Sequence, residues 1–377
     1  MAKKSKKKVS WGQWIMVAGF MLIGGICGIL IAEYMDKAFS SGQPIGEVIF
    51  TIALLFVGMY VAMFLQIVIH ESGHLVFGLL SGYQFSSFRI GSFMIINKNG
   101  KLKFKRLSLA GTGGQCLMNP PEMADGKIPY VLYNLGGSIL NIISSVLFIG
   151  LLLIVHNSNV LHLLLLMLAV IGAAFALLNG IPMRMGTVDN DGYNAMSLGK
   201  DKEALRSFWV QMRVSNEQIS GQRLKDMPEE WFEVPSDEGM KNSMLAVMGV
   251  FSCNRLMDEK RFEEADRLME HFMRIKTGIV GVHRNLMTCD RIYCALLRGD
   301  GPEKIEKMLD KQQKKFMKTM KKFPTVIRTE YAIALLMEKD ITKFEKIKEQ
   351  FEKTAQSYPY ASDIESEREL MELADNI

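Results

Sequence analysis

The stretch from Ile128 to Met183 contains no Asp, Glu, Lys or Arg. A water-soluble domain does not leave such a length of chain without charge, whereas two adjacent membrane spans require it. From Arg184 to the C-terminus charged residues are dense. The 377 residues are enough for two or more domains, so the charge distribution divides the chain into a membrane part and a water-facing part.

Four apolar segments have the length of about 20 residues that a bilayer span requires. They cover residues 12–33, 48–80, 130–155 and 160–181. The first follows five lysines and has Trp11 and Trp14 at its start, which suits an interfacial anchor. Its apolar run exceeds that of a signal peptide, so we expect an uncleaved anchor helix rather than a cleaved leader.

The basic residues indicate the orientation of these spans, because Lys and Arg favour the cytoplasmic side. The lysines before residue 9 place the N-terminus in the cytoplasm, and the basic loop at 89–106 returns the chain to that side. The fourth span then delivers the C-terminal half there as well. We expect a multi-pass protein of a bacterial cell membrane with both termini in the cytoplasm, a lipid bilayer as partner and no nucleic acid.

Between the second and third spans the hydrophobic period changes. The segment KLKFKRLSL alternates polar and apolar residues, and NKNGK before it contains an Asn-Gly hairpin turn. This pattern predicts a β-hairpin over 86–110 that lies against the membrane surface. The following GTGGQCLMNPP predicts an irregular or edge segment, in which Cys116 is a small apolar filler.

The C-terminal half reads as helical and repetitive. Three segments combine an apolar helix, a short polar break and an amphipathic helix, and Leu256, Leu296 and Leu335 mark equivalent places about forty residues apart. Stacked tetratricopeptide-like hairpins and a plain helical bundle both fit. The predicted fold is therefore mainly α: a polytopic membrane helical bundle of about four spans with a small cytoplasmic β-hairpin, then a C-terminal soluble all-α domain.

The second span ends in the polar sequence HESGH at 70–74. His70 and His74 stand four residues apart, so on a helix they share one face and can hold one Zn²⁺. Glu71 lies beside them, where it can take a proton from an activated water. An ionisable set inside an apolar span marks a functional site, although a polar cluster bonded between helices is the alternative.

A catalytic zinc requires three protein ligands and one open position. His156 and His162 lie at the outer end of the membrane in this topology, and His271 and His283 lie in the soluble half. Carboxylates fit better as the third ligand. The segment after the fourth span offers two of them, Asp189 and Asp191, on the same side of the membrane as His70.

In its order of motifs the chain resembles the site-2 protease family of intramembrane zinc metalloproteases (M50-like peptidases). It has HESGH at 70–74, GSILN at 137–141, and NGIP at 179–182 followed by DG at 191–192. The resemblance covers roughly residues 45–195. It implies a Zn²⁺ cofactor with His70, His74 and Asp191 as ligands, Glu71 as general base, and Asn141 and Asn179 as residues that contact substrate.

Two departures from the family pattern affect this assignment. The middle motif lacks the usual proline after its glycine, and the stretch from Pro182 to Asp191 is about four residues longer than the common form. The longer stretch leaves the choice between Asp189 and Asp191 open. Helix-to-helix hydrogen bonding is the alternative role for Asn141 and Asn179.

The sequence thus predicts an N-terminal basic segment and anchor helix (1–45), an intramembrane metalloprotease core (46–198) and a cytoplasmic helical domain (199–377). The expected activity is hydrolysis of a membrane-embedded or membrane-associated peptide near the cytoplasmic face, with substrate or a protein regulator bound by the C-terminal helices. Two other classes compete with this interpretation: a catalytically inactive membrane scaffold with a docking domain, and a soluble zinc protease tethered by one helix.

Overall fold

The computed structural model describes residues 18, 21, 25, 44–108, 112–155, 159–185 and 188–377. These residues are mainly helical and include one four-stranded antiparallel sheet. Their contacts form two compact units that do not follow the order of the sequence. The first unit comprises the chain up to Tyr83 together with Pro129–Lys200, and the second comprises Gln84–Ile128 together with Asp201–Ile377.

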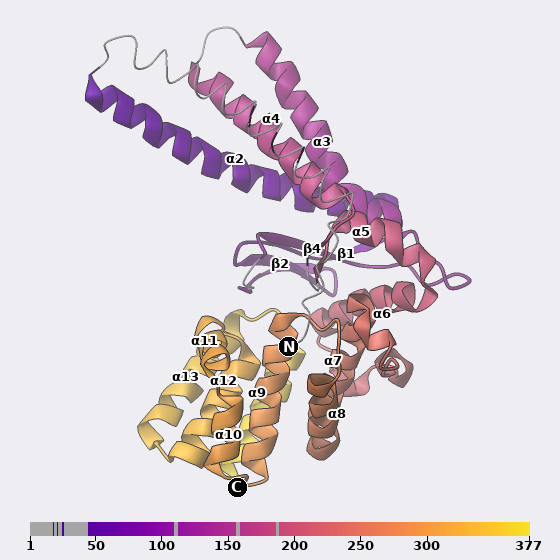
Figure 1. Ribbon diagram of the computed structural model, residues 1–377, viewed down its shortest axis with the longest axis vertical. Coiled ribbons are helices and arrows are strands. Elements are labelled where there is room, and N and C mark those ends of the chain that lie inside the picture. The colour runs from indigo at the N-terminus through magenta and orange to yellow at the C-terminus, as the bar shows by residue number, and fades with distance from the viewer. Residues whose placement is uncertain are drawn as a thin grey trace, which may run out of the picture. The chain divides into compact units, whose positions relative to one another are not determined.

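The first unit is built on three long helices that pack against one another (Figure 1): α2 (Ile45–Leu80), α3 (Tyr130–Ile154) and α4 (Asn159–Gly180). Among the described residues, Ile45–Leu80, Tyr130–Ile154 and Leu161–Gly180 are long and apolar enough to cross a membrane. These helices correspond to the second, third and fourth predicted spans. The predicted first span, 12–33, lies outside the described residues except for three isolated positions.

Helix α2 has 36 residues, which gives a length of about 54 Å, well beyond the ~30 Å of a bilayer core. Its N-terminal part exposes large apolar side chains such as Phe50, Phe56 and Phe64, as a lipid-facing helix does. Its C-terminal part instead carries buried polar residues. The helix ends where Gly82 takes a φ of 85°, a conformation that glycine adopts without strain.

A short connection follows α4 in the first unit. It contains the antiparallel pair β5 (Arg184–Met185) and β6 (Val188–Asp189), then α5 (Asp191–Ser197) and the 3₁₀ turn η1 (Leu198–Lys200).

The sheet belongs to the second unit and has the strand order β3-β2-β1-β4. Its strands are β1 (Gln84–Ile90), β2 (Phe93–Lys98), β3 (Lys101–Arg106) and β4 (Gly114–Asn119). The predicted Asn-Gly turn joins β2 to β3, and Asn99 and Gly100 have the positive φ values, 53° and 78°, of a type I′ turn. The sequence predicted one hairpin of two strands, but the sheet has four strands, because β1 pairs with β2 and β4 pairs with β1. Strand β4 is an edge strand, as expected; the position of the sheet against the membrane remains a prediction.

Helices make up the rest of the second unit. Each of the three predicted helical pairs consists of elements in contact: α7 with α8, α9 with α10, and α12 with α13. Tetratricopeptide-like character remains a prediction. The helices are α6 (Lys202–Ser220), α7 (Ser243–Asp258), α8 (Phe262–Arg274), α9 (Gly281–Leu297), α10 (Pro302–Met308), α11 (Lys311–Thr319), α12 (Pro324–Ala332), α13 (Ile341–Ser357) and α14 (Ala361–Asp375), with the 3₁₀ turns η2 (Leu224–Asp226), η3 (Glu229–Phe232) and η4 (Gly239–Lys241) and the π-helical turn η5 (Ile333–Glu338).

The sheet and the C-terminal helices share one apolar core. Met94 and Ile96 of β2 are about 1% exposed and pack in a cluster with Tyr331 of α12 and Phe351 of α13. On the other face of the sheet Phe104 is 83% exposed. The predicted boundary at residue 199 therefore divides residues that pack together, because β2 completes a core formed by helices more than 200 positions later.

This shared core predicts that a substitution in β2 will loosen the C-terminal helices. Ile96→Asp buries a charge in the cluster, and we expect a loss of about 4 kcal/mol or more in unfolding free energy. Limited proteolysis of the full chain in detergent should then cut within α12 to α14. Phe104→Asp, on the exposed face of the neighbouring strand, is the matched control. Equal protease resistance of the two variants would contradict the shared core.

Candidate metal centre

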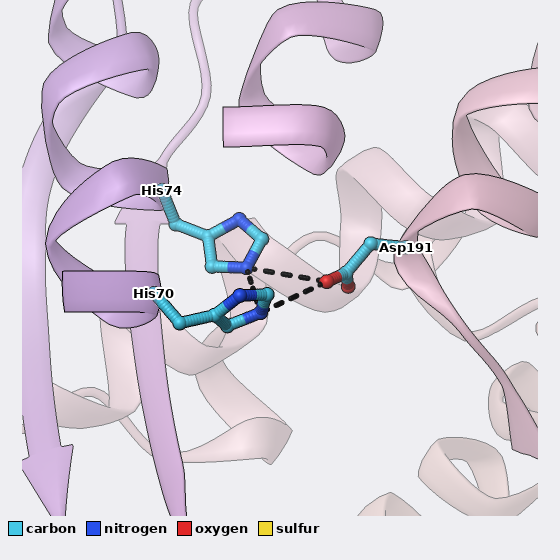
Figure 2. Close-up of side chains that lie close together, drawn as sticks. All are labelled: His70, His74 and Asp191. Carbon is cyan, nitrogen blue, oxygen red and sulfur yellow. Dashed lines mark hydrogen bonds and ion pairs between the residues drawn. The ribbon is translucent and has the colours of Figure 1, made fainter. Parts of the chain in front are cut away.

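Three side chains from two elements converge in the first unit (Figure 2). His70 and His74 lie one turn apart on α2, and Asp191 is the first residue of α5. Asp191 Oδ2 lies 3.2 Å from His70 Nε2 and 3.4 Å from His74 Nε2, and the two Nε2 atoms are 3.3 Å apart. Among the described residues this is the one group of His, Cys, Asp and Glu with metal-binding spacing.

The triangle of Nε2, Nε2 and Oδ2 atoms has the size of one face of a tetrahedral zinc site. Zinc bonds to nitrogen and oxygen are about 2.0–2.1 Å long, which places neighbouring ligands of a tetrahedron about 3.3–3.4 Å apart. The three observed separations run from 3.2 to 3.4 Å. Three protein ligands leave the fourth position open, as in catalytic rather than structural zinc sites. The residues present therefore fit a zinc ion.

Hydrogen bonds at the far nitrogen of each ring direct both Nε2 atoms into the triangle. His74 Nδ1 lies 2.8 Å from the backbone oxygen of Tyr133, and His70 Nδ1 lies 2.7 Å from Asn141 Oδ1. A carbonyl oxygen can only accept, so Nδ1 carries the proton and Nε2 keeps its lone pair. Metal-binding histidines in proteins are oriented in this way.

Glycines allow α3 to approach α2 closely enough for these bonds. A Cβ atom on Gly73 would lie 2.2 Å from the backbone oxygen of Gly136, and one on Gly136 would lie 2.5 Å from that of Gly73. A Cβ on Gly137 would lie 2.5 Å from His70 Cε1. In the GSILN motif the glycine therefore makes room for the His70 ring, and the asparagine one turn later holds its Nδ1.

Asn190 holds the Asp191 backbone against the end of α4. Its Oδ1 accepts from the backbone nitrogens of Met183 and Tyr193, and its Nδ2 donates to the carbonyls of Leu178 and Ile181. It is thus both the N-cap of α5 and a clamp on the preceding loop. Gly192 follows Asp191, and a Cβ there would lie 2.1 Å from the backbone oxygen of Gly180.

The sequence left open whether Asp189 or Asp191 is the third candidate ligand, and the geometry distinguishes the two. Asp191 points at the histidines, whereas Asp189 is bonded to Arg184, with Arg184 Nε 2.7 Å from Asp189 Oδ1. Asp191 Oδ2 therefore faces both Nε2 atoms, and a carboxylate in this position can bind a cation together with the two imidazoles.

The remaining predicted site residues are placed as follows. Glu71 is buried beside His70, at 8% exposure. Asn179 is half-buried and donates to the backbone oxygen of Phe175 in its own helix. Asn141 is fully buried between His70 and Gln66. A substrate contact by either asparagine remains a prediction.

Sequence reasoning missed two residues of this region, Gln66 and Asn190. Gln66 is a fully buried amide one turn before His70 on α2. The sequence did contain an indication of this residue. A polar side chain in an apolar span, four positions before a candidate metal ligand, lies on the same helix face and needs a hydrogen-bond partner. Asn190 could have been recognised as an N-cap, the preferred place of asparagine directly before a helix.

Comparison with known proteins agrees with these features. A buried pair of histidines spaced by three residues on a membrane-type helix, a glutamate beside the first and a distant aspartate are features of a metalloprotease. The family model described as Peptidase family M50 matches residues 58–361, most of the chain, and the protein belongs to this family of intramembrane metalloproteases. No curated protein and no solved structure matches it.

The contrast between the aspartates predicts different effects on metal content. Asp191→Ala should lose most of the bound zinc, because it removes one vertex of the triangle, whereas Asp189→Ala should keep about one zinc per chain. Metal analysis of the two purified variants measures the difference. If Asp189→Ala loses the metal and Asp191→Ala retains it, the third ligand is assigned wrongly.

The close packing of Gly137 on His70 predicts a second effect. Gly137→Ala should push the imidazole out of the triangle and lower zinc affinity about 10–100-fold, the usual cost of misorienting a ligand. Gly150→Ala on the same helix is the matched control, because a Cβ there meets no atom within 4 Å. Competition with a chelating zinc indicator gives both affinities, and equal values would exclude this role of Gly137.

Proposed function

We propose that this metalloprotease uses one Zn²⁺ ion, held by His70, His74 and Asp191, to hydrolyse a peptide bond in a membrane-embedded or membrane-associated peptide or protein. The observation that carries the proposal is the triangle of ligand atoms with tetrahedral zinc spacing. It lies in a unit whose helices are apolar enough to span a bilayer, so the substrate is one that reaches into or lies on the membrane.

Each site residue has a distinct role in this reaction. The two imidazoles and the carboxylate supply three ligand atoms, and their partners at Asn141 and Tyr133 keep the rings in place. A zinc ion held there would supply Lewis-acid chemistry, which polarises the scissile carbonyl and makes water more acidic. Glu71 takes the proton from the attacking water and passes it to the leaving amine.

Substrate binding and orientation complete the proposal. The lysines before residue 9 and the basic loop at 89–106 mark the cytoplasmic ends of the spans. His70 lies near one of these ends, which favours cleavage near the cytoplasmic face. Strand β4 lies at one edge of the sheet, and an edge strand is the structure to which an extended peptide adds. Addition as a strand would expose the carbonyls that a helical substrate hides. The C-terminal helices are the proposed site for a substrate segment or a protein regulator.

Replacement of the general base tests the activity. Glu71→Gln should keep zinc near one per chain and lower cleavage at least about 10²–10⁴-fold, because an amide cannot accept the proton. The measurement compares membrane-associated peptides from cells that contain the wild type or this variant, by mass spectrometry. Products that depend on the wild type should map to the cytoplasmic ends of their parent segments.

Three outcomes of that comparison count against the proposal. Cleavage by Glu71→Gln at close to the wild-type rate would remove Glu71 as the base. Cleavage sites at the outer ends of the parent segments would reverse the orientation. A wild type that binds zinc but yields no products would favour an inactive scaffold.

A further inference from the structure

We propose that Gln66 is a positioning residue that sets the tautomer of the zinc ligand His70 through Asn141; the inference rests on the zinc site of the proposed function. Gln66 and Asn141 are both 0% exposed. They lie on different helices, α2 and α3, and form a chain of hydrogen bonds that ends at His70 Nδ1.

The series of hydrogen bonds begins at the backbone oxygen of Leu168, which can only be an acceptor. Gln66 lies with its Nε2 2.8 Å from the backbone oxygen of Leu168 in α4. A backbone oxygen can only accept, so the amide nitrogen of Gln66 must point toward α4 and its Oε1 must point toward α3. The amide of Gln66 therefore has one orientation.

The orientation of the Gln66 amide determines that of the Asn141 amide, which in turn determines which nitrogen of His70 carries the proton. Asn141 Nδ2 donates to Gln66 Oε1 at 2.6 Å and also lies 3.2 Å from the backbone oxygen of Gln66. With its nitrogen so engaged, Asn141 turns its Oδ1 toward His70 Nδ1, 2.7 Å away. An oxygen there requires a proton on Nδ1, which leaves Nε2 free to bind a metal.

A reversed Asn141 amide would have the opposite effect. Its nitrogen would face His70 Nδ1 and would donate to it, so the ring proton would move to Nε2 and block the metal-binding position. Asparagine by itself does not choose between these orientations, because both ends of its amide form hydrogen bonds. Two oxygens of Gln66 select the orientation of Asn141: the side-chain Oε1 at 2.6 Å, whose direction is fixed by the bond to Leu168, and the more distant backbone oxygen at 3.2 Å.

The packing around Gln66 supports a specific role. A Cβ atom at Gly172 of α4 would lie 2.7 Å from Gln66 Nε2, so the glycine provides the space that this amide occupies. Ser144 Oγ also lies 3.4 Å from Gln66 Oε1, a second donor on the side where Asn141 donates. Gln66 of α2 therefore contacts residues of both α3 and α4.

The test compares Gln66→Met in two backgrounds. Methionine keeps the length and volume of glutamine but does not donate to Leu168 and does not offer Asn141 the nearer acceptor, Oε1; the backbone oxygen, 3.2 Å away, remains. In the wild-type background we expect zinc affinity to fall about 10–100-fold. In an Asn141→Ala background the amide through which Gln66 acts is absent, so Gln66→Met should change the affinity that remains by less than about twofold.

The readout is the zinc dissociation constant of the full chain in detergent, measured by competition with a chelating indicator. Gln66→Leu is a second replacement and should show the same dependence on background. Ser145→Ala is the matched control, since Ser145 lies in the same helix contact but donates only to the backbone oxygen of Asn141. Its affinity should equal that of the wild type.

The outcomes separate this inference from the proposed function. Equal losses for Gln66→Met in both backgrounds would mean that Gln66 only packs, and no loss in either would remove it from the site. A wild type that binds no zinc, or an Asp191→Ala variant that binds it as well as the wild type does, would overturn the zinc site itself.

Discussion

The contact of α2 with α3 at Gly73 and Gly136 is the constraint on which the rest of the site depends. At this point backbone meets backbone, with no room for a side chain on either helix. The closeness brings three different groups of α3 to the two histidines: the Tyr133 carbonyl, the space at Gly137 and the Asn141 amide. A wider helix pair would leave both imidazoles in an apolar interior without partners, where unpaired polar groups are costly.

Asp191 is held near the histidines by side-chain hydrogen bonds rather than by helix packing. Asp191 is the first residue of the short helix α5 and directly follows a loop, and loops are usually mobile unless their backbone groups are hydrogen-bonded. Asn190 supplies those bonds with four contacts from one side chain. The first unit thus combines a close helical pair, which positions the two histidines, with a short helix whose N-cap holds the aspartate beside them.

The sequence was sufficient to predict which side chains lie together where the arrangement depends on local spacing. His70 and His74 follow from helical periodicity, and Glu71 from its place between them. The choice between Asp189 and Asp191 depended on where α5 begins and on the Arg184 partner, and neither is a matter of spacing. The role of Asn141 was equally hidden, because an amide offers both a donor and an acceptor and the structure decides which one faces the metal ligand.

For the fold, too, the sequence predicted the local elements but not the contacts between distant segments. Long apolar runs identified the helices of the first unit, and the Asn-Gly turn identified one hairpin. The pairing of β1 with β4 and the packing of β2 on Tyr331 and Phe351 were not predictable, since they join residues far apart in the chain. Contacts of that range leave no periodic pattern in either partner.

The sheet that lies between two spans in sequence has a consequence for biosynthesis. Strands β1 to β4 leave the ribosome early, but the helices that cover Met94 and Ile96 are synthesised only after α3 and α4. The apolar face of the sheet therefore waits uncovered while the membrane helices are inserted, and nascent chains expose unburied strands to misassembly during such a delay. Closure of this core therefore requires residues that are synthesised only after α3 and α4.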